Sequence, residues 1–294
     1  MYESFYNFKE KPFSLLPDPD FLYLSKKHEA ALNVLQYGLI NMAGFTVVTG
    51  EIGSGKTTLI RTLLNRISND LVVGLISNPH KDFGSLLQWI SLAFGLEYKD
   101  KENIELFDNL RNFFISRYAA GKRVVLIIDE AQNLSVDTLE ELRLISNINA
   151  DKDQVLQIIL TGQPELHSTL KKPELEQFNQ RIAMDYQLKA LSMEEVHNYV
   201  RHRLICSNGN ENLFDQKAIS LIAYYSCGIP RVINNFCELA LVYGFADEKE
   251  LITVDIALAA IKDKTKNNDI KIPPFILDGK KNDEVELLES AINL

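Results

Sequence analysis

GEIGSGKTT occupies residues 50–58, after the apolar run FTVVT and before LIRTLL. The pattern G-x-x-x-x-G-K-[ST] fixes four positions, and a chance match in a chain of 294 residues has odds on the order of one per cent. A phosphate group requires backbone N–H groups that point into a tight loop, with a helix N-terminus behind them. Because a strand, a loop and a helix are all predicted here, the stretch indicates a nucleotide-binding loop rather than a glycine-rich turn.

The residue types in this loop have separate predicted roles. Glycines let the backbone curl around phosphate oxygens, the lysine reaches the outer phosphates, and the threonine hydroxyl after it is a ligand for Mg²⁺. The predicted cofactor-binding residues are Gly50, Glu51, Ile52, Gly53, Ser54, Gly55, Lys56, Thr57 and Thr58. We assign the catalytic contact with the phosphates to Lys56 and the metal contact to Thr57.

The composition is that of a globular protein with two packed units. Of the 294 residues, 46% are hydrophobic and 24% are charged, and domains usually contain about 100 to 200 residues. The longest aliphatic run, VVLII at 124–128, is too short to span a bilayer. Since the N-terminus lacks the features of a secretory signal, we expect a cytoplasmic protein. The net charge of -9 works against sequence-independent binding of nucleic acid.

The histidines give no indication of a metal site or of a catalytic triad. The five histidines are His28, His80, His167, His197 and His202. They form no HExxH motif and no triad-like grouping, so we expect most of them on the surface or in packing contacts.

Short β-branched runs alternate with helical patterns between residues 45 and 190. This alternation is typical of a parallel sheet that is covered on both faces. The predicted strands are 45–49, 71–77, 124–129, 156–161 and 183–188. The segments between them carry apolar residues at intervals of three and four, as helices packed on a sheet do. We therefore predict an α/β fold with a five-stranded parallel sheet.

Strand signals stop after Leu188, and a small all-helical unit is predicted to follow. Ser192 and Glu195 form a capping-box pattern, and Thr253 is expected to cap a last helix. The predicted organisation is an N-terminal segment with the first helix over 1–44, a core over 45–190, a helical unit over 191–265, and a linker with an acidic tail over 266–294. Both a docking role and disorder remain open for the tail.

The second half of a hydrolytic site is predicted in VVLIIDEAQ. Hydrolysis of a nucleotide needs a carboxylate that positions the metal and a group that activates water. The acidic pair Asp129 and Glu130 lies at the end of the apolar strand. Asp129 is expected to hold Mg²⁺, and Glu130 is expected to polarise the attacking water. An acidic pair can end any strand, but the preceding phosphate loop favours the catalytic interpretation.

Together these motifs resemble the AAA+ ATPases and, among them, the ExeA/GspA-like secretion ATPases, including the variant found in PEP-CTERM exopolysaccharide loci. The resemblance covers about residues 1–264. Its narrower motifs are PF…PDP, DEAQNL, GQPEL, QRI and GIPRVIN, in this order. It implies a P-loop AAA+ core followed by a helical lid, with ATP and Mg²⁺ as cofactors and ATP hydrolysis as the activity.

The resemblance also implies roles for three polar residues beyond the two motifs. Sensor 1, which orients the lytic water, is assigned first to Gln163 and second to Thr161, although either could instead cap the turn before Pro164. Arg181 of NQRI matches the arginine finger, which reaches the γ-phosphate of a neighbouring subunit. The alternative for Arg181 is a solvated surface charge.

Two further parts of the sequence are expected beside the nucleotide by resemblance. Arg231 follows Gly228-Ile229-Pro230 and matches sensor 2 of the lid, with a surface pairing to Glu238 or another local acid as the alternative. Leu22 and Tyr23 are candidates for apolar contact with the adenine, or else for the protein core.

By resemblance, copies of the chain would form a ring or filament and drive or regulate assembly of an envelope secretion, pilus or exopolysaccharide export apparatus. GspA-type members continue into a membrane span and a periplasmic region, which this sequence lacks, so recruitment to the inner membrane is expected through a partner. The alternative is a TnsC-like DNA-binding ATPase that regulates transposition, for which the basic stretches at Lys26-Lys27, Lys171-Lys172 and Lys280-Lys281 are modest. A nucleotide-binding scaffold with little turnover is a third interpretation.

Overall fold

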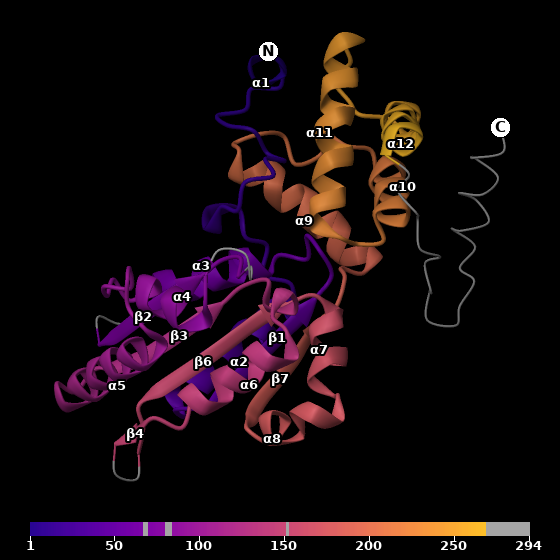
Figure 1. The fold of residues 1–294 in the computed structure, drawn as a ribbon. Coiled ribbons are helices and arrows are strands. Elements are labelled where there is room, and N and C mark those ends of the chain that lie inside the picture. Colours follow the sequence, from indigo (N-terminus) through magenta and orange to yellow (C-terminus); the bar gives the residue numbers. More distant parts are fainter. Residues whose placement is uncertain (67–69, 80–83, 151–152, 269–294) are drawn as a thin grey trace. The chain divides into compact units, whose positions relative to one another are not determined.

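The computed structural model describes residues 1–66, 70–79, 84–150 and 153–268 (Figure 1). The chain divides into two compact units. The described residues of Lys26–Lys189 form the sheet unit, and Met1–Ser25 join the described residues after Lys189 in the helical unit. The N-terminal segment predicted over 1–44 is thus divided between the units after Ser25. The predicted acidic tail lies outside the described residues, apart from its first three positions.

Five parallel strands form the sheet, in the order β2-β3-β6-β1-β7. They are β1 (Phe45–Gly50), β2 (Leu71–Ile76), β3 (Arg123–Ile128), β6 (Leu156–Gly162) and β7 (Ile182–Leu188). Each begins and ends within one residue of its predicted bounds, so the five-stranded prediction is confirmed. A short antiparallel pair, β4 (Asn149–Ala150) and β5 (Asp153–Gln154), was not predicted, because two-residue strands leave no periodic signal.

Helices cover both faces of the sheet, as a parallel sheet requires. One face meets α2 (Lys26–Ile40), where the side chain of Gln157 in β6 donates to the carbonyl of Leu39 at 3.1 Å. The preceding and following residues of β6, Leu156 and Ile158, point to the other face and join the main core. The helices of that second face are α4 (Leu86–Ala93), α5 (Asn103–Ala119), α6 (Val136–Ile145), α7 (Pro164–Leu170) and α8 (Glu176–Asn179).

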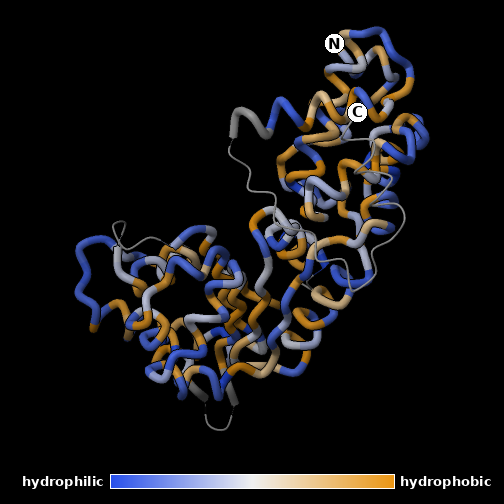
Figure 2. Tube along the Cα trace, turned by 90° about the vertical axis from the view of Figure 1, so that its right-hand side faces the viewer, coloured by the Kyte–Doolittle hydropathy of each residue, from blue (hydrophilic) through white to orange (hydrophobic). Residues whose placement is uncertain are grey.

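Four longer helices make up most of the helical unit. They are α9 (Met193–Cys206), α10 (Gln216–Ser226), α11 (Pro230–Ala246) and α12 (Val254–Asn268). The capping box is confirmed at the start of α9, where Ser192 and Glu195 each accept a hydrogen bond from the backbone N–H of the other. Hydrophilic and hydrophobic residues alternate along the helices (Figure 2), which is the pattern of helices that bury one face. No helix in the described ranges has both the length and the apolar character to cross a membrane.

The N-terminal segment is held in the helical unit by a buried arginine. Arg203 of α9 is 6% exposed, and it donates hydrogen bonds to the carbonyls of Pro12 and Ser14. Its guanidinium also lies 4.6 Å from the ring centroid of Phe21. A second donor, the side chain of Asn234 in α11, reaches the Ser14 carbonyl at 3.3 Å. Together with buried aromatic rings, these contacts explain why residues 1–25 belong to this unit rather than to the sheet.

Candidate nucleotide-binding site

The phosphate loop connects the end of β1 at Gly50 to α3 (Lys56–Arg66). Gly53 and Gly55 have φ angles of 81° and 101°, which lie in the left-handed region that favours glycine. A Cβ atom on Gly50 would lie 2.9 Å from the carbonyl oxygen of Leu188 in β7, so the backbone packing leaves no room for a side chain. The two glycines of the motif, Gly50 and Gly55, and the additional Gly53 are therefore favoured by the conformation and packing of the loop.

Lys56 lies under the loop and is 5% exposed. Its ammonium donates to the carbonyl oxygens of Gly50 at 2.7 Å and Glu51 at 3.0 Å. The hydroxyl of Ser54 is buried beside it and makes no hydrogen bond within the described structure. A buried cation, an unpaired hydroxyl and a left-handed glycine backbone fit a phosphate group, since each supplies a donor or the space for one.

Asp129 follows β3 and accepts hydrogen bonds on both carboxylate oxygens. The hydroxyl of Thr57 donates to Oδ2 at 2.7 Å, and the hydroxyl of Thr161 donates to Oδ1 at 2.6 Å. The backbone N–H of Glu130 adds a third hydrogen bond at 3.0 Å. Carboxylate and hydroxyl oxygens are ligands that Mg²⁺ prefers, so Thr57 and Asp129 fit the metal role predicted for them. The structure brings together both residues of the predicted metal site, although they are 72 positions apart.

Glu130 is held in a defined orientation by two glutamines. Its backbone φ of 54° is unusual for a residue with a side chain, and it starts the turn η3 (Ala131–Asn133). The amide nitrogen of Gln132 donates to Glu130 Oε2 at 2.7 Å, and that of Gln163 reaches the same oxygen at 3.4 Å. The oxygen of the Gln132 amide accepts from the backbone N–H of Gln163 at 3.0 Å. Gln132 thus connects the predicted catalytic carboxylate to the start of α7.

Both candidates for sensor 1 contact the acidic pair, each through a different carboxylate. Thr161 binds Asp129, whereas Gln163 binds Glu130. Gln163 occupies the position before α7 but makes no capping hydrogen bond with its side chain. Its amide is therefore available to the site, as the first choice for sensor 1 requires. Gln132 was missed by the sequence reasoning, because nothing in its spacing distinguishes it from a surface glutamine.

Arg181 and the phosphate loop lie at opposite ends of two neighbouring strands, β7 and β1. Arg181 directly precedes β7, whose first residue pairs with Phe45 at the start of β1, while the loop follows Gly50 at the end of β1. The guanidinium of Arg181 donates to the hydroxyl of Ser146 at 3.0 Å and approaches the carbonyl of Arg143 at 3.4 Å. With strands that rise about 3.3 Å per residue, Arg181 is roughly 20 Å from the loop of its own chain.

The remaining predicted site residues belong to the helical unit. Arg231 is exposed in the first turn of α11, and although both it and Glu238 are described, they form no ion pair. Glu238 instead accepts from the hydroxyl of Tyr2 at 2.8 Å. Tyr23 packs its ring against those of α9, and the residue before it, Leu22, is half-buried. Contact of Arg231, Leu22 and Tyr23 with a nucleotide stays a prediction.

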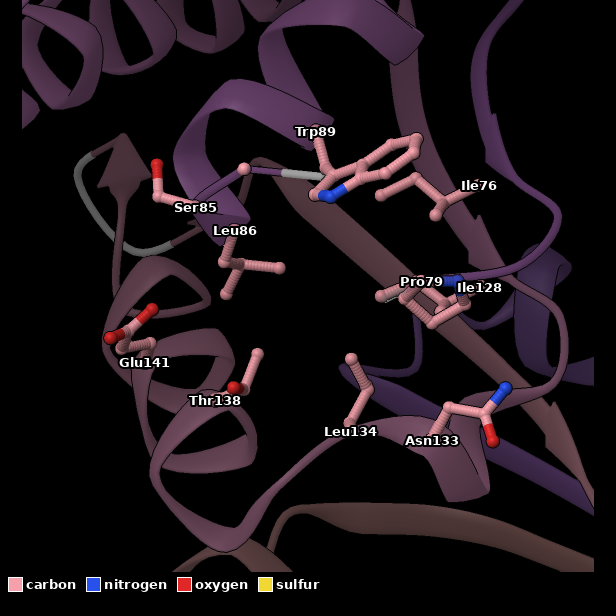
Figure 3. Close-up of a pocket in the computed structure, with 11 residues that line it drawn as sticks. Ile76, Pro79, Ser85, Leu86, Trp89, Ile128, Asn133, Leu134, Thr138 and Glu141 are labelled. Atoms are coloured by element: carbon pink, nitrogen blue, oxygen red, sulfur yellow. The ribbon is translucent and has the colours of Figure 1, made fainter. Parts of the chain in front are cut away.

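A separate cavity of about 180 Å³ lies between α4 and α6 (Figure 3). Ile76 and Ile128, the last residues of β2 and β3, line it together with Leu86, Trp89 and Leu134. Among the described residues that line this cavity there is no lysine or arginine, and the mostly apolar lining does not suit a triphosphate. The candidate phosphate site is therefore the loop at the end of β1.

Comparisons with known proteins identify the family of this chain. The sequence model of an AAA domain family matches residues 40–170. General secretion pathway protein A of Aeromonas hydrophila is 41% identical over 262 residues, which cover 88% of this chain and 48% of that protein. The chain thus spans about half the length of this curated relative.

Solved structures share the fold at low sequence identity. ORC2 of Aeropyrum pernix, determined as ADPNP-ADP complexes, superposes with a TM-score of 0.64 at 18% identity and covers 87% of this chain and 72% of that chain. A Walker-type ATPase of Pyrococcus abyssi gives a TM-score of 0.60 at 19% identity, with 95% of this chain and 80% of that chain covered. At these identities the likeness concerns the fold alone.

The fold and the phosphate loop define a P-loop protein of the AAA+ class. Within this class, the chain belongs to the family of ATPases related to General secretion pathway protein A. The expectations for family and fold are thereby confirmed.

Proposed function

We propose that the chain binds ATP with Mg²⁺ at the phosphate loop and hydrolyses it to ADP and phosphate. The observation that carries this proposal is the contact between the two motifs, in which Thr57 of the loop donates to Asp129 of the strand at 2.7 Å. This contact brings the predicted metal ligands to one point, beside Lys56 and Glu130. When bound, Mg²⁺ neutralises charge on the phosphate oxygens.

In the proposed mechanism, the residues of this chain divide the work of hydrolysis. Backbone N–H groups and Lys56 hold the phosphates, while Glu130 accepts a proton from the attacking water as it approaches the γ-phosphorus. The short hydrogen bond from Gln132 orients the carboxylate, and Gln163 is placed to position the water. Donors that are aimed at the phosphates when the nucleotide is bound would stabilise the negative charge of the transition state. The Lys56 ammonium, which donates to the Gly50 and Glu51 carbonyls in this structure, would turn to the phosphates on binding.

Arg181 is proposed to act on the nucleotide of another copy of the chain. A distance of roughly 20 Å along the sheet prevents it from reaching its own loop, since an arginine side chain is far shorter. The arginine would stabilise charge on the γ-phosphate in the transition state, and hydrolysis would then depend on assembly into a ring or filament. Arg231 of the helical unit is proposed as sensor 2, with the helical unit as the lid and Leu22 and Tyr23 beside the adenine.

The proposed task is assembly or regulation of an envelope secretion, pilus or exopolysaccharide export apparatus, and it is supported by the similarity to a protein whose name places that protein in the general secretion pathway. Nucleotide-dependent changes in contacts between copies would bias the assembly of a partner. Recruitment to the inner membrane would then take place through that partner.

Two variants mixed in one assay test both hydrolysis and the action of Arg181 in a second copy. Glu130→Gln retains the arginine but loses the base, and Arg181→Ala retains the base but loses the arginine. We expect each variant alone to release phosphate slowly and the mixture to exceed the average of the two, because a mixed assembly contains complete sites. A mixture that matches the average would contradict action in a second copy.

A DNA-binding assay of the wild-type protein tests the competing function as a DNA-binding ATPase. With ATP bound, we expect no measurable binding to duplex DNA as salt is varied from low to physiological concentration. DNA affinity that falls steeply with salt would instead support the TnsC-like interpretation, because phosphate contacts release counterions.

A further inference from the structure

His28 is a buried histidine at the start of α2, and the mechanism above gives it no role. Its side chain is 4% exposed, so it is one of the histidines in packing contacts. Its Nε2 atom lies 2.9 Å from the backbone carbonyl oxygen of Ser54, in the middle of the phosphate loop. A carbonyl oxygen only accepts hydrogen bonds, so Nε2 must carry the proton and donate it.

The imidazole also packs against the next residue of the loop. A Cβ atom on Gly55 would lie 3.2 Å from His28 Nε2 and 3.6 Å from its Cδ2. Gly55 already has a φ of 101°, so both its backbone conformation and the adjacent ring favour glycine there. The ring of His28 therefore contacts the loop at the peptide bond that joins Ser54 to Gly55.

The geometry of that peptide bond gives the contact a consequence for phosphate binding. In a trans peptide the carbonyl and the N–H point in opposite directions within one plane. When His28 holds the Ser54 carbonyl on the α2 side, the Gly55 N–H points to the other side of the loop. Backbone N–H groups of such loops are the donors that cradle phosphates.

We propose that His28 is a positioning residue of the phosphate loop, which fixes the Ser54–Gly55 peptide plane so that the Gly55 N–H faces the phosphates. This inference rests on the proposed nucleotide site and adds a donor that no loop motif contains. The residue acts through the backbone, so it should affect the binding of the phosphates more than the chemical step.

Two substitutions at this position separate the hydrogen bond from the packing of the ring. His28→Phe keeps a planar ring but removes the donor, whereas His28→Gln loses the ring but keeps an amide N–H with similar reach. His167→Ala is the matched control, because this half-exposed histidine of the same unit pairs with Asp185 at 3.1 Å. All three are compared with the wild type by titrating a fluorescent ADP analogue, and by melting the nucleotide-free protein.

We expect His28→Phe to weaken ADP binding about fivefold to tenfold, which corresponds to the loss of one hydrogen bond. His28→Gln should bind within about twofold of the wild type, and His167→Ala should not differ from it. At saturating ATP, the rate of His28→Phe should fall much less than its affinity. Binding by His28→Phe at wild-type strength, or equal weakening in His28→Gln and His28→Phe, would overturn the proposal.

A measurement on the intact protein covers the case in which the variants do not fold. Nitrogen NMR of the nucleotide-free wild type should show His28 protonated at Nε2, and an unprotonated Nε2 would overturn the proposal. Lys56→Ala tests the proposed nucleotide site separately from the proposed role of His28. If the wild type binds ADP and this variant does not, the nucleotide site stands, and only the histidine variants decide the role of His28.

Discussion

The hydroxyl of Thr161 should stabilise the sheet unit through its hydrogen bond to Asp129. The oxygen atoms are 2.6 Å apart, and Thr161 is 1% exposed, so water cannot replace the bond easily. Substitution of Thr161 by valine removes the donor and keeps the shape. A hydrogen bond to a charged group is worth about 1.5 to 3 kcal/mol. Since Asp129 keeps its other two donors, we expect Thr161→Val to lower the free energy of unfolding by about 2 kcal/mol.

Thr49 offers a matched control on the neighbouring strand. It is also 1% exposed, but its hydroxyl has no hydrogen-bond partner in the described structure. Burial of a hydroxyl without a partner is unfavourable, so Thr49→Val should be neutral or slightly stabilising. The same chemical change should therefore lower stability at Thr161 but not at Thr49 on the adjoining strand.

Urea unfolding followed by tryptophan fluorescence measures both variants. The chain has one tryptophan, Trp89, which lies in the sheet unit, so the signal reports on that unit even if the helical unit unfolds separately. Equal losses of stability in Thr161→Val and Thr49→Val would show that the hydrogen bond to Asp129 is not the source of the stability. A loss below about 0.5 kcal/mol in Thr161→Val would lead to the same conclusion.

Three further variants test other contacts. Gln132→Ala should lower the rate at saturating ATP about tenfold and leave ADP affinity unchanged, because the 2.7 Å hydrogen bond that orients Glu130 is lost; an unchanged rate would contradict this role. Gly50→Ala should destabilise the sheet unit by about 1 to 3 kcal/mol, since the new Cβ would lie 2.9 Å from a backbone oxygen. Tryptophan fluorescence in urea measures this loss of stability, and a variant as stable as the wild type would show that the strands adjust. Arg203→Met should make the N-terminal segment sensitive to proteolysis, because the backbone carbonyls of that segment lose a charged hydrogen-bond donor. Wild-type resistance to protease would show that the aromatic contacts are enough to hold the segment.

The sequence predicted the parts of the site that depend on neighbouring residues. The phosphate loop is contiguous, and its glycines are demanded by local backbone angles. Asp129 and Glu130 follow an apolar run that only a buried strand explains, and the strands themselves were recognisable because they are short β-branched runs. These features therefore appeared at the expected positions in the structure.

Contacts between distant segments were not predictable in this way. His28 meets Ser54 across 26 positions, and Arg203 meets Ser14 across 189. Neither spacing leaves a periodic trace, because helix and strand periods describe which face is buried and not which partner covers it. For the same reason, the strand order could not be predicted from the sequence, and residues 1–44 were predicted as one segment although the structure divides them between the two units after Ser25.

The proposed role of Glu130 is to activate water for attack on a triphosphate held by the loop. Its most direct test is the identity of the nucleotide bound after incubation with ATP and Mg²⁺, followed by removal of free nucleotide and chromatography of the denatured protein. We predict ADP on the wild type and intact ATP on Glu130→Gln. Intact ATP on both proteins, or ADP on both, would contradict this role.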